Sequence, residues 1–279
     1  MNPLTGRSPL MKVAGYVAMV AVLAVVALPL YWVLVTSFKT PDMVYIQPPK
    51  WWPEPVTADP YLRVVEQVPF VRYFTNSLII TGALVAAKLT LGILSAYAFV
   101  YLRFPGRSAV FMLVLAALMV PNQITVISNY ALIAQLGWIN TFQGIILPLA
   151  GVAFGTFLMR NHFLTLPFEI IEAARMDGCG HLKLLFRVLL PMSWPTVVAF
   201  ALISIVNEWN EYLWPFLVAS DETVAPLQVG LARLISTDAY IDWPMVMAAT
   251  VLTITPILVV FLLLQRHMIK GLTSGAVKG

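Results

Sequence analysis

Charged and amide side chains stand inside apolar stretches of this sequence, where they are costly. Lys88 interrupts one stretch, and another ends in a polar group made of Asn207, Glu208, Asn210 and Glu211. An ionisable group near the centre of a bilayer costs at least ~3 kcal/mol, so it usually faces the protein interior, pairs or serves a function. These groups could hydrogen-bond a hydroxyl-rich solute, or they could lock neighbouring helices together. We favour a solute path, because two carboxylates and two amides exceed what helix packing usually needs.

The spacing of these side chains predicts how they would be arranged on a helix. At about 100° per residue, Asn207 to Glu211 would span an arc of about 160°, with Trp209 on the opposite side. Lys88 would lie only about 6 Å deeper from the outer surface than Glu208, a gap that a lysine side chain can cover. An ion pair between Lys88 and Glu208 is therefore a hypothesis for a structure to test.

Further polar and aromatic residues are candidates for the same path. Pro121 interrupts another apolar stretch, and the amides of Asn122 and Gln123 beside it could hydrogen-bond either a solute or a neighbouring helix. Tyr212 and Trp214 follow the polar group directly. They complete the set of path candidates.

Motifs for catalysis or metal binding are absent from the sequence. There is no GxxxxGKS/T loop, so the chain cannot itself be an ATPase, and there is no HExxH motif or nucleophile elbow. The single cysteine, Cys179, excludes an intramolecular disulfide. The net charge of +4 comes with no basic cluster or zinc spacing, so we expect no nucleic-acid partner. We predict that the chain is not an enzyme and binds no metal or cofactor itself.

The composition identifies the elements that must carry these residues. Of the 279 residues, 60% are hydrophobic and 11% charged, whereas a soluble domain carries roughly a quarter charged residues. Because lipid offers the backbone no hydrogen-bond partner, a helix needs about 20 apolar residues to cross a bilayer. We predict an all-α polytopic membrane protein with six transmembrane helices, the first retained and not cleaved as a signal peptide. The apolar runs are 13–37, 75–101, 108–130, 142–160, 192–218 and 245–265.

The distribution of positive charge predicts the orientation of these helices. With the N-terminus inside, eleven of the 17 lysines and arginines fall in inner segments, five in outer ones, and Lys88 within the membrane. The positive-inside bias then places both termini in the cytoplasm. The outer segment at about 38–73 contains Trp51, Trp52 and several prolines, and we expect no independent outer domain there.

The inner loop at 161–191 is too polar to span a membrane and too apolar to be a plain solvated linker. Pro167 can open a short helix, Glu169 suits its positive N-terminal end, and Gly178 supplies a stop. A second short helix at about 180–189 would then lead into the fifth membrane helix. The loop is either a docking surface for another protein or an amphipathic segment that packs beneath the bundle, and periodicity alone does not decide between them.

A set of residues in this loop has a characteristic spacing: Glu172, Ala173, Ala174, Gly178, Val188, Leu190 and Pro191. In type and spacing they resemble the EAA signature of permeases of ATP-binding-cassette (ABC) importers, with Val188 as a conservative replacement for the usual isoleucine. The resemblance implies a coupling helix seated in a cleft of an ATPase subunit. Glu172 would be its charged anchor, and Ala173 and Ala174 its close-contact face. Asp177 and Gly178 would form the turn.

Other segments narrow the resemblance to one branch of these permeases. Residues 101–107 read YLRFPGR, residues 209–215 read WNEYLWP and residues 265–279 read QRHMIKGLTSGAVKG. They are similar to the carbohydrate-uptake branch and its maltose-type second permease. A finer similarity to the glycerol-3-phosphate and glycerophosphodiester permease is carried by 104–107, by LPL at 147–149 and by FLMRNHFLTLP at 157–167.

The C-terminal tail carries a further implication of that resemblance. In the maltose-type relative the tail inserts between the two ATPase subunits. The tail here is 266–279, and Gly271, Gly275 and Lys278 are its candidate contacts. Glycine lets a backbone follow another protein's surface closely, although a glycine-bearing tail can equally be disordered.

The resemblance implies a complete transport assembly in a bacterial plasma membrane. Residues 1–279 would form a single transmembrane domain that pairs with a second, homologous permease, an ATPase dimer and an extracytoplasmic solute-binding protein. ATP and Mg would be bound by the ATPase subunits. The expected function is import of glycerol 3-phosphate, of glycerophosphodiesters such as glycerophosphocholine, or of a related sugar.

Three other functions remain as alternatives. A permease for maltose-type or trehalose-type oligosaccharides would have the same signature. A stand-alone ion-coupled carrier would instead show two halves with matching broken helices, and no such correspondence is visible in the sequence. A membrane enzyme would need turnover without an ATPase partner. The residues themselves do not identify the solute.

Overall fold

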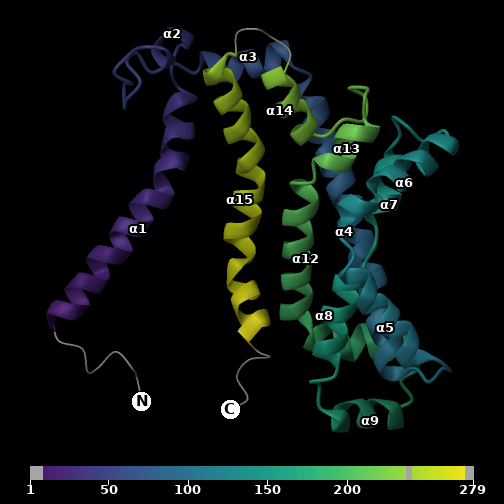
Figure 1. Ribbon diagram of the computed structural model, residues 1–279. Coiled ribbons are helices and arrows are strands. Elements are labelled where there is room, and N and C mark those ends of the chain that lie inside the picture. The colour runs from purple at the N-terminus through teal and green to yellow at the C-terminus, as the bar shows by residue number, and fades with distance from the viewer. Residues whose placement is uncertain (1–8, 237–240, 274–279) are drawn as a thin grey trace. The chain divides into compact units, whose positions relative to one another are not determined.

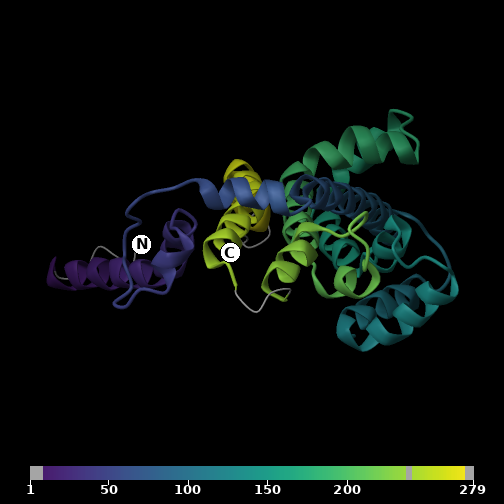
Figure 2. The same cartoon turned by 90° about the horizontal axis from the view of Figure 1, so that it is seen from above.

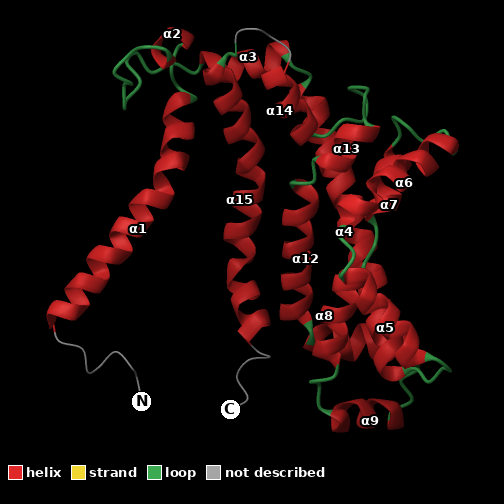
Figure 3. Ribbon diagram, viewed as in Figure 1, coloured by secondary structure: helices red, strands yellow, loops and turns green. Residues whose placement is uncertain are grey.

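Helices make up the regular structure throughout the described part of the chain, 9–236 and 241–273, in this computed structural model (Figure 3). Three of them are long and apolar enough to cross a membrane: α1 (Pro9–Thr36), α4 (Phe70–Tyr101) and α15 (Trp243–Thr273). They correspond to the predicted runs at 13–37, 75–101 and 245–265. The all-α membrane fold is therefore confirmed.

The remaining predicted spans are bent helix pairs. The bends are 100° between α5 (Arg107–Leu118) and α6 (Asn122–Gln135), 44° between α7 (Phe142–Leu149) and α8 (Ala153–Phe163), and 83° between His181–Met192 and α12 (Trp194–Trp209). Pro121 is the residue before α6; it has no N–H to donate and its ring disfavours a helical conformation at the residue before it, so α5 cannot continue through this position. Among the described residues the structure holds three spans, or up to six if each bent pair is one span. The count of six stays a prediction.

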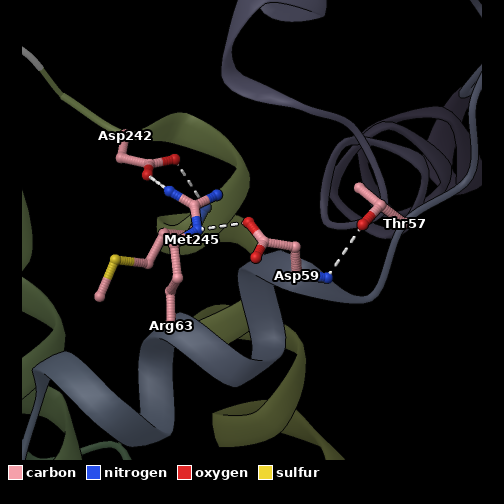
Figure 4. Close-up of polar contacts among 5 residues, drawn as sticks. All are labelled: Thr57, Asp59, Arg63, Asp242 and Met245. Atoms are coloured by element: carbon pink, nitrogen blue, oxygen red, sulfur yellow. Dashed lines mark hydrogen bonds and ion pairs between the residues drawn. The ribbon is translucent and has the colours of Figure 1, made fainter.

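The chain separates into two compact units, with one boundary just before α4 and the other two within α14 (Leu227–Ser236) and α15. The first comprises 1–68 and 231–254, with α2 (Pro41–Val44) and α3 (Asp59–Gln67) in the predicted outer segment. Within it, Arg63 of α3 forms ion pairs with Asp59 at 2.7 Å and with Asp242 (Figure 4). Asp242 also accepts a hydrogen bond from the backbone N–H of Met245 at 3.2 Å, so it caps the start of α15.

The same unit buries a cation. Lys39 is 1% exposed, its Nζ donates to the carbonyl of Lys50 at 2.6 Å, and it lies 4.3 Å from the ring centroid of Trp32. The aromatic face and the carbonyl oxygen both attract the ammonium group. Burial lowers the pKa of Lys39 below its usual value, because desolvation disfavours the charged form.

The second unit, 69–230 and 255–279, is built around α4, which packs against α8 and α12 (Figure 1, Figure 2). Its core cluster joins Tyr97 of α4, Phe163 of α8 and Phe200 of α12. Gly155 lets α8 approach α12 closely, because a Cβ at this position would overlap the Phe200 ring. This core supports the two groups of candidate site residues, those of the inner loop at 161–191 and the polar residues on α4 and α12.

Candidate functional site

The inner loop at 161–191, called the coupling loop below after the resemblance that it carries, contains the predicted short helix. This helix is α9 (Phe168–Met176), with Pro167 as the residue before its first turn. Gly178 has φ +75°, a conformation that costs other residues strain. Its N–H donates to the carbonyl of Arg175 at 3.0 Å, and the N–H of Cys179 donates to that of Ala174 at 3.0 Å. These two bonds form a Schellman stop. The helix and its glycine stop are therefore confirmed.

One side of α9 packs against the core of the second unit, and the other side is exposed. Ile171 is 2% exposed in the core cluster, and Ala174 packs against that cluster. Glu172 and Ala173 are exposed, as are Phe168 and Met176, the latter by 82%. Figure 1 shows α9 lying across the end of this unit. Because Ala174 already contacts the chain's own core, Ala173 is the alanine that remains accessible to another protein.

The second half of the loop is helical to Met192, beyond the predicted end at about 189. It consists of α10 (His181–Leu184), a π-helical turn (Leu185–Leu189) and α11 (Leu190–Met192). The N–H of Leu190 donates to the carbonyl of Leu185, five residues earlier. Pro191 has no N–H and would clash with a carbonyl four residues earlier, which explains a wider turn at this point. Leu190 and Pro191 thus end the π-helical turn just before the bend into α12.

Within the membrane-spanning part, Lys88 of α4 and Glu208 of α12 form an ion pair. Their side chains are 17% and 7% exposed. The predicted pair is therefore confirmed. An unpaired charge in such surroundings would be strongly unfavourable, so each residue supplies the counter-ion that lets the other be buried.

The predicted continuous helix from 192 to 218 is wrong, and so is the 160° polar arc. Helix α12 ends at Trp209, and α13 (Leu213–Val218) starts after a break. The amide of Asn210 donates to the carbonyl of Val206 at 2.7 Å, which satisfies a carbonyl at the end of α12. Glu211, the residue before the N-cap Tyr212, accepts from the backbone N–H of Trp214 at 3.2 Å and so satisfies a donor in the first turn of α13.

The remaining path candidates occupy different surroundings. Asn207 and Tyr212 are exposed, whereas Trp214 is buried with its indole N–H donating to the carbonyl of Gly144 at 3.1 Å. Gln123 is exposed at the start of α6, a different element from the ion pair. Asn122 begins the same helix, but its side chain is outside the described residues, as are Gly275 and Lys278 of the tail. Gly271 lies within α15.

Glu208, the acidic member of the pair, borders a small cavity. Ser77, Thr81, Glu208 and Glu211 line a space of about 10 Å³, which is room for about one water molecule. A solute does not fit there in this conformation. A path along these residues would therefore need the cavity to widen.

The sequence analysis assigned no structural role to Asn76 and Ser77, which stand at the start of the apolar run at 75–101. The amide of Asn76 donates to the carbonyls of Thr223 at 3.1 Å and Ala225 at 2.9 Å. The hydroxyl of Ser77 accepts the N–H of Leu227 at 2.8 Å. Both side chains hold the 223–227 segment against α4. Their positions at the start of an apolar run were the only signal in the sequence.

Comparison with known proteins places this geometry in a family context. Residues 88–274 match the family described as "Binding-protein-dependent transport system inner membrane component". The chain is 34% identical over 276 residues to the sn-glycerol-3-phosphate transport system permease protein UgpE of Brucella abortus, covering 96% of this chain and 98% of that one. It is 40% identical over 207 residues to UgpE of Yersinia pestis, covering 74% of each.

Solved structures share the fold. A chain of a bacterial ABC transporter involved in the import of the acidic polysaccharide alginate matches with a TM-score of 0.83 and 24% identity, covering 93% of this chain and 98% of that chain. A bacterial alginate ABC transporter in complex with an alginate pentasaccharide-bound periplasmic protein matches with a TM-score of 0.67 and 16% identity, covering 91% and 92%. At these identities the likeness is one of fold.

Proposed function

The chain belongs to the inner membrane components of binding-protein-dependent transport systems, and on that premise we propose that it forms half of the translocation path for glycerol 3-phosphate or a related glycerophosphodiester or sugar. It is a permease component of an ABC importer and not an enzyme. Full-length similarity to permeases named for sn-glycerol 3-phosphate supports this solute class. Membership of this family argues against a stand-alone ion-coupled carrier.

The observation that carries the mechanism is the exposed side of α9. A rigidly stopped helix that is anchored by Ile171 and presents Glu172, Ala173 and Met176 outward suits docking into a cleft of an ATPase subunit. Closure of an ATPase dimer would then move α9, and the shared core cluster would pass that movement to α4, α8 and α12. Asp177 and Gly178 would keep the end of α9 in place.

The proposed assembly contains a second, homologous permease, two ATPase subunits that bind ATP and Mg, and an extracytoplasmic solute-binding protein. Residues 1–279 would act in it as one transmembrane domain with both termini in the cytoplasm. The tail contacts proposed for Gly271, Gly275 and Lys278 would add a second connection to the ATPase. Eleven positive side chains in the inner segments, against five in the outer ones, support this orientation.

The polar cluster suggests which part of the solute this chain would contact. Glu208 neutralises Lys88, and Glu211 adds a further carboxylate beside the same cavity. A phosphate group would be repelled by that surplus of negative charge. The exposed amides of Asn207 and Asn210 and the hydroxyl of Tyr212 instead suit hydrogen bonds to the hydroxyl groups of a polyol.

Purification of the tagged chain from its native membrane tests the proposal. We expect a second permease and an ATPase to copurify, with ATP hydrolysis that a binding protein stimulates. Glycerol 3-phosphate, glycerophosphocholine and maltose, each added with the binding protein, would distinguish the solutes. Stimulation by maltose alone would reject glycerol 3-phosphate and its phosphodiesters as the solutes and favour a sugar. Transport by the isolated chain without ATP would reject the assembly.

A further inference from the structure

A pocket of about 370 Å³ lies beside the coupling loop, between the end of α4 and the corner that joins α9 to α10. Its volume is within the range of small-molecule sites. The side chains that concern us are Tyr101 and Arg103 at the end of α4, Arg175 in the last turn of α9, and His181 at the start of α10. All of them belong to the second compact unit.

The lining of this pocket is cationic and has no acidic residue. Within the described ranges, the guanidinium groups of Arg103 and Arg175 form no ion pair and no hydrogen bond with another residue. Each guanidinium is a planar set of donors that matches the oxygens of a phosphate or carboxylate. Two such groups at one pocket repel each other, and an anion between them would relieve that repulsion.

The other polar groups are held in place by contacts outside the pocket. The hydroxyl of Tyr97 is 2.7 Å from Nδ1 of His181, which fixes the imidazole ring and leaves Nε2 for a further partner. The hydroxyl of Tyr101 donates to the carbonyl of Phe163 at 3.1 Å. This side of the pocket is therefore ordered before any ligand arrives.

We propose that this pocket binds the phosphate group of an anion on the cytoplasmic side, either the headgroup of an anionic phospholipid or a soluble phosphate. A phosphate has enough oxygens to accept from both guanidiniums and from His181 at once. Because Arg103 follows α4 and Arg175 belongs to α9, the bound anion ties the coupling helix to the central membrane helix. The proposal uses the cytoplasmic orientation of this end and does not depend on the transported solute.

The test uses the transporter purified with its partner subunits in nanodiscs. In discs of phosphatidylcholine, inorganic phosphate is titrated by calorimetry. In discs of phosphatidylcholine with phosphatidylglycerol, and without free phosphate, retained phosphatidylglycerol is measured by native mass spectrometry. The variant Arg103→Gln/Arg175→Gln removes both guanidiniums. Arg103→Gln alone leaves α9 unchanged, and Arg187→Gln is a matched control because it removes an exposed arginine that does not line the pocket.

We expect the double variant to bind the anion at least about tenfold more weakly than wild type, since each charged hydrogen bond is worth about one order of magnitude. Arg103→Gln should show part of that loss, and Arg187→Gln none. A loss confined to the phosphate titration identifies a soluble ligand, and a loss confined to retained phosphatidylglycerol identifies a lipid. Phosphate bound at the ATPase nucleotide sites would be the same in every variant. Equal binding by all variants in both arms, or no binding by wild type, overturns the proposal.

Discussion

Removal of one charge from the Lys88–Glu208 pair should cost far more stability than removal of both. Lys88→Met leaves Glu208, with a side chain only 7% exposed, without its counter-ion. Breaking a buried pair in this way costs about 3–5 kcal/mol. Glu208→Gln should fall at the lower end of that range, because the lysine side chain, 17% exposed, can reach toward water more easily.

The double variant Lys88→Met/Glu208→Gln leaves no buried charge, so its cost should be close to zero. The interaction energy of the cycle is the cost of the double variant minus the costs of both single variants, so it is about 6 kcal/mol or more in magnitude. At about 2–4 °C per kcal/mol for a chain of this size, each single variant should lower the melting temperature by roughly 6 °C or more. Because such unfolding is often irreversible, all four proteins are heated at one rate and the surviving complex is measured by size-exclusion chromatography.

Uptake in cells provides a second measurement of the same pair. The exchange Lys88→Glu/Glu208→Lys should recover transport that either single charge removal abolishes. In the melting-temperature measurement, Lys88→Met/Glu208→Gln could instead lose the sum of the two single losses, which would mean that the two charges act independently. That result would refute the reasoning.

Three further perturbations test other parts of the structure. Glu172→Lys should abolish stimulation of ATP hydrolysis by the binding protein while the chain still inserts into the membrane, and normal uptake by this variant would contradict the docking role. Gly178→Ala should cost about 1–2 kcal/mol, because φ is +75° there, whereas Gly180→Ala, with open space and an ordinary φ, should be neutral in the same thermal assay. Burial lowers the pKa of Lys39 below 10.5, so between the lowered value and 10.5 the unfolded chain binds more protons than the folded one, and stability rises with pH. Lys39→Met should remove this rise, and an unchanged pH dependence of the melting temperature would show that Lys39 does not cause it.

The coupling loop shows how much of a site can be predicted locally. A proline before the helix, a glycine after it and apolar residues at helical spacing correctly predicted α9 and its stop, because all of the hydrogen bonds involved join residues within five positions. The outward direction of Glu172 and Ala173 also follows from that spacing, once Ile171 is known to face the core. Ala174 follows Ile171 by three residues and so falls on the same side of the helix, where it contacts the core cluster; the family resemblance had assigned it to the docking face instead.

The break after Trp209 shows where hydropathy misleads. An apolar run looks the same whether one helix continues through it or two helices meet within it. Here the Asn210 amide donates to a carbonyl in the last turn of α12, and Glu211 accepts from an N–H in the first turn of α13. Side chains interpreted as a polar face therefore bond to the backbone at helix ends. The polar group itself was the local signal, since such residues compete for backbone groups at helix termini.

The all-α membrane class follows from composition, because lipid leaves a backbone no other way to satisfy its hydrogen bonds, and α9 with its glycine stop follows from local motifs. The depth of two residues along their helices suggested the Lys88–Glu208 pair, but only the packed helices show that the two side chains meet. The packing also reveals, without any signal for these partners in the sequence, that Asn76 holds the 223–227 segment and that Arg103 and Arg175 line one pocket. These contacts join residues far apart in the chain. Composition and periodicity describe only neighbours, so the partners of distant side chains depend on how the helices pack.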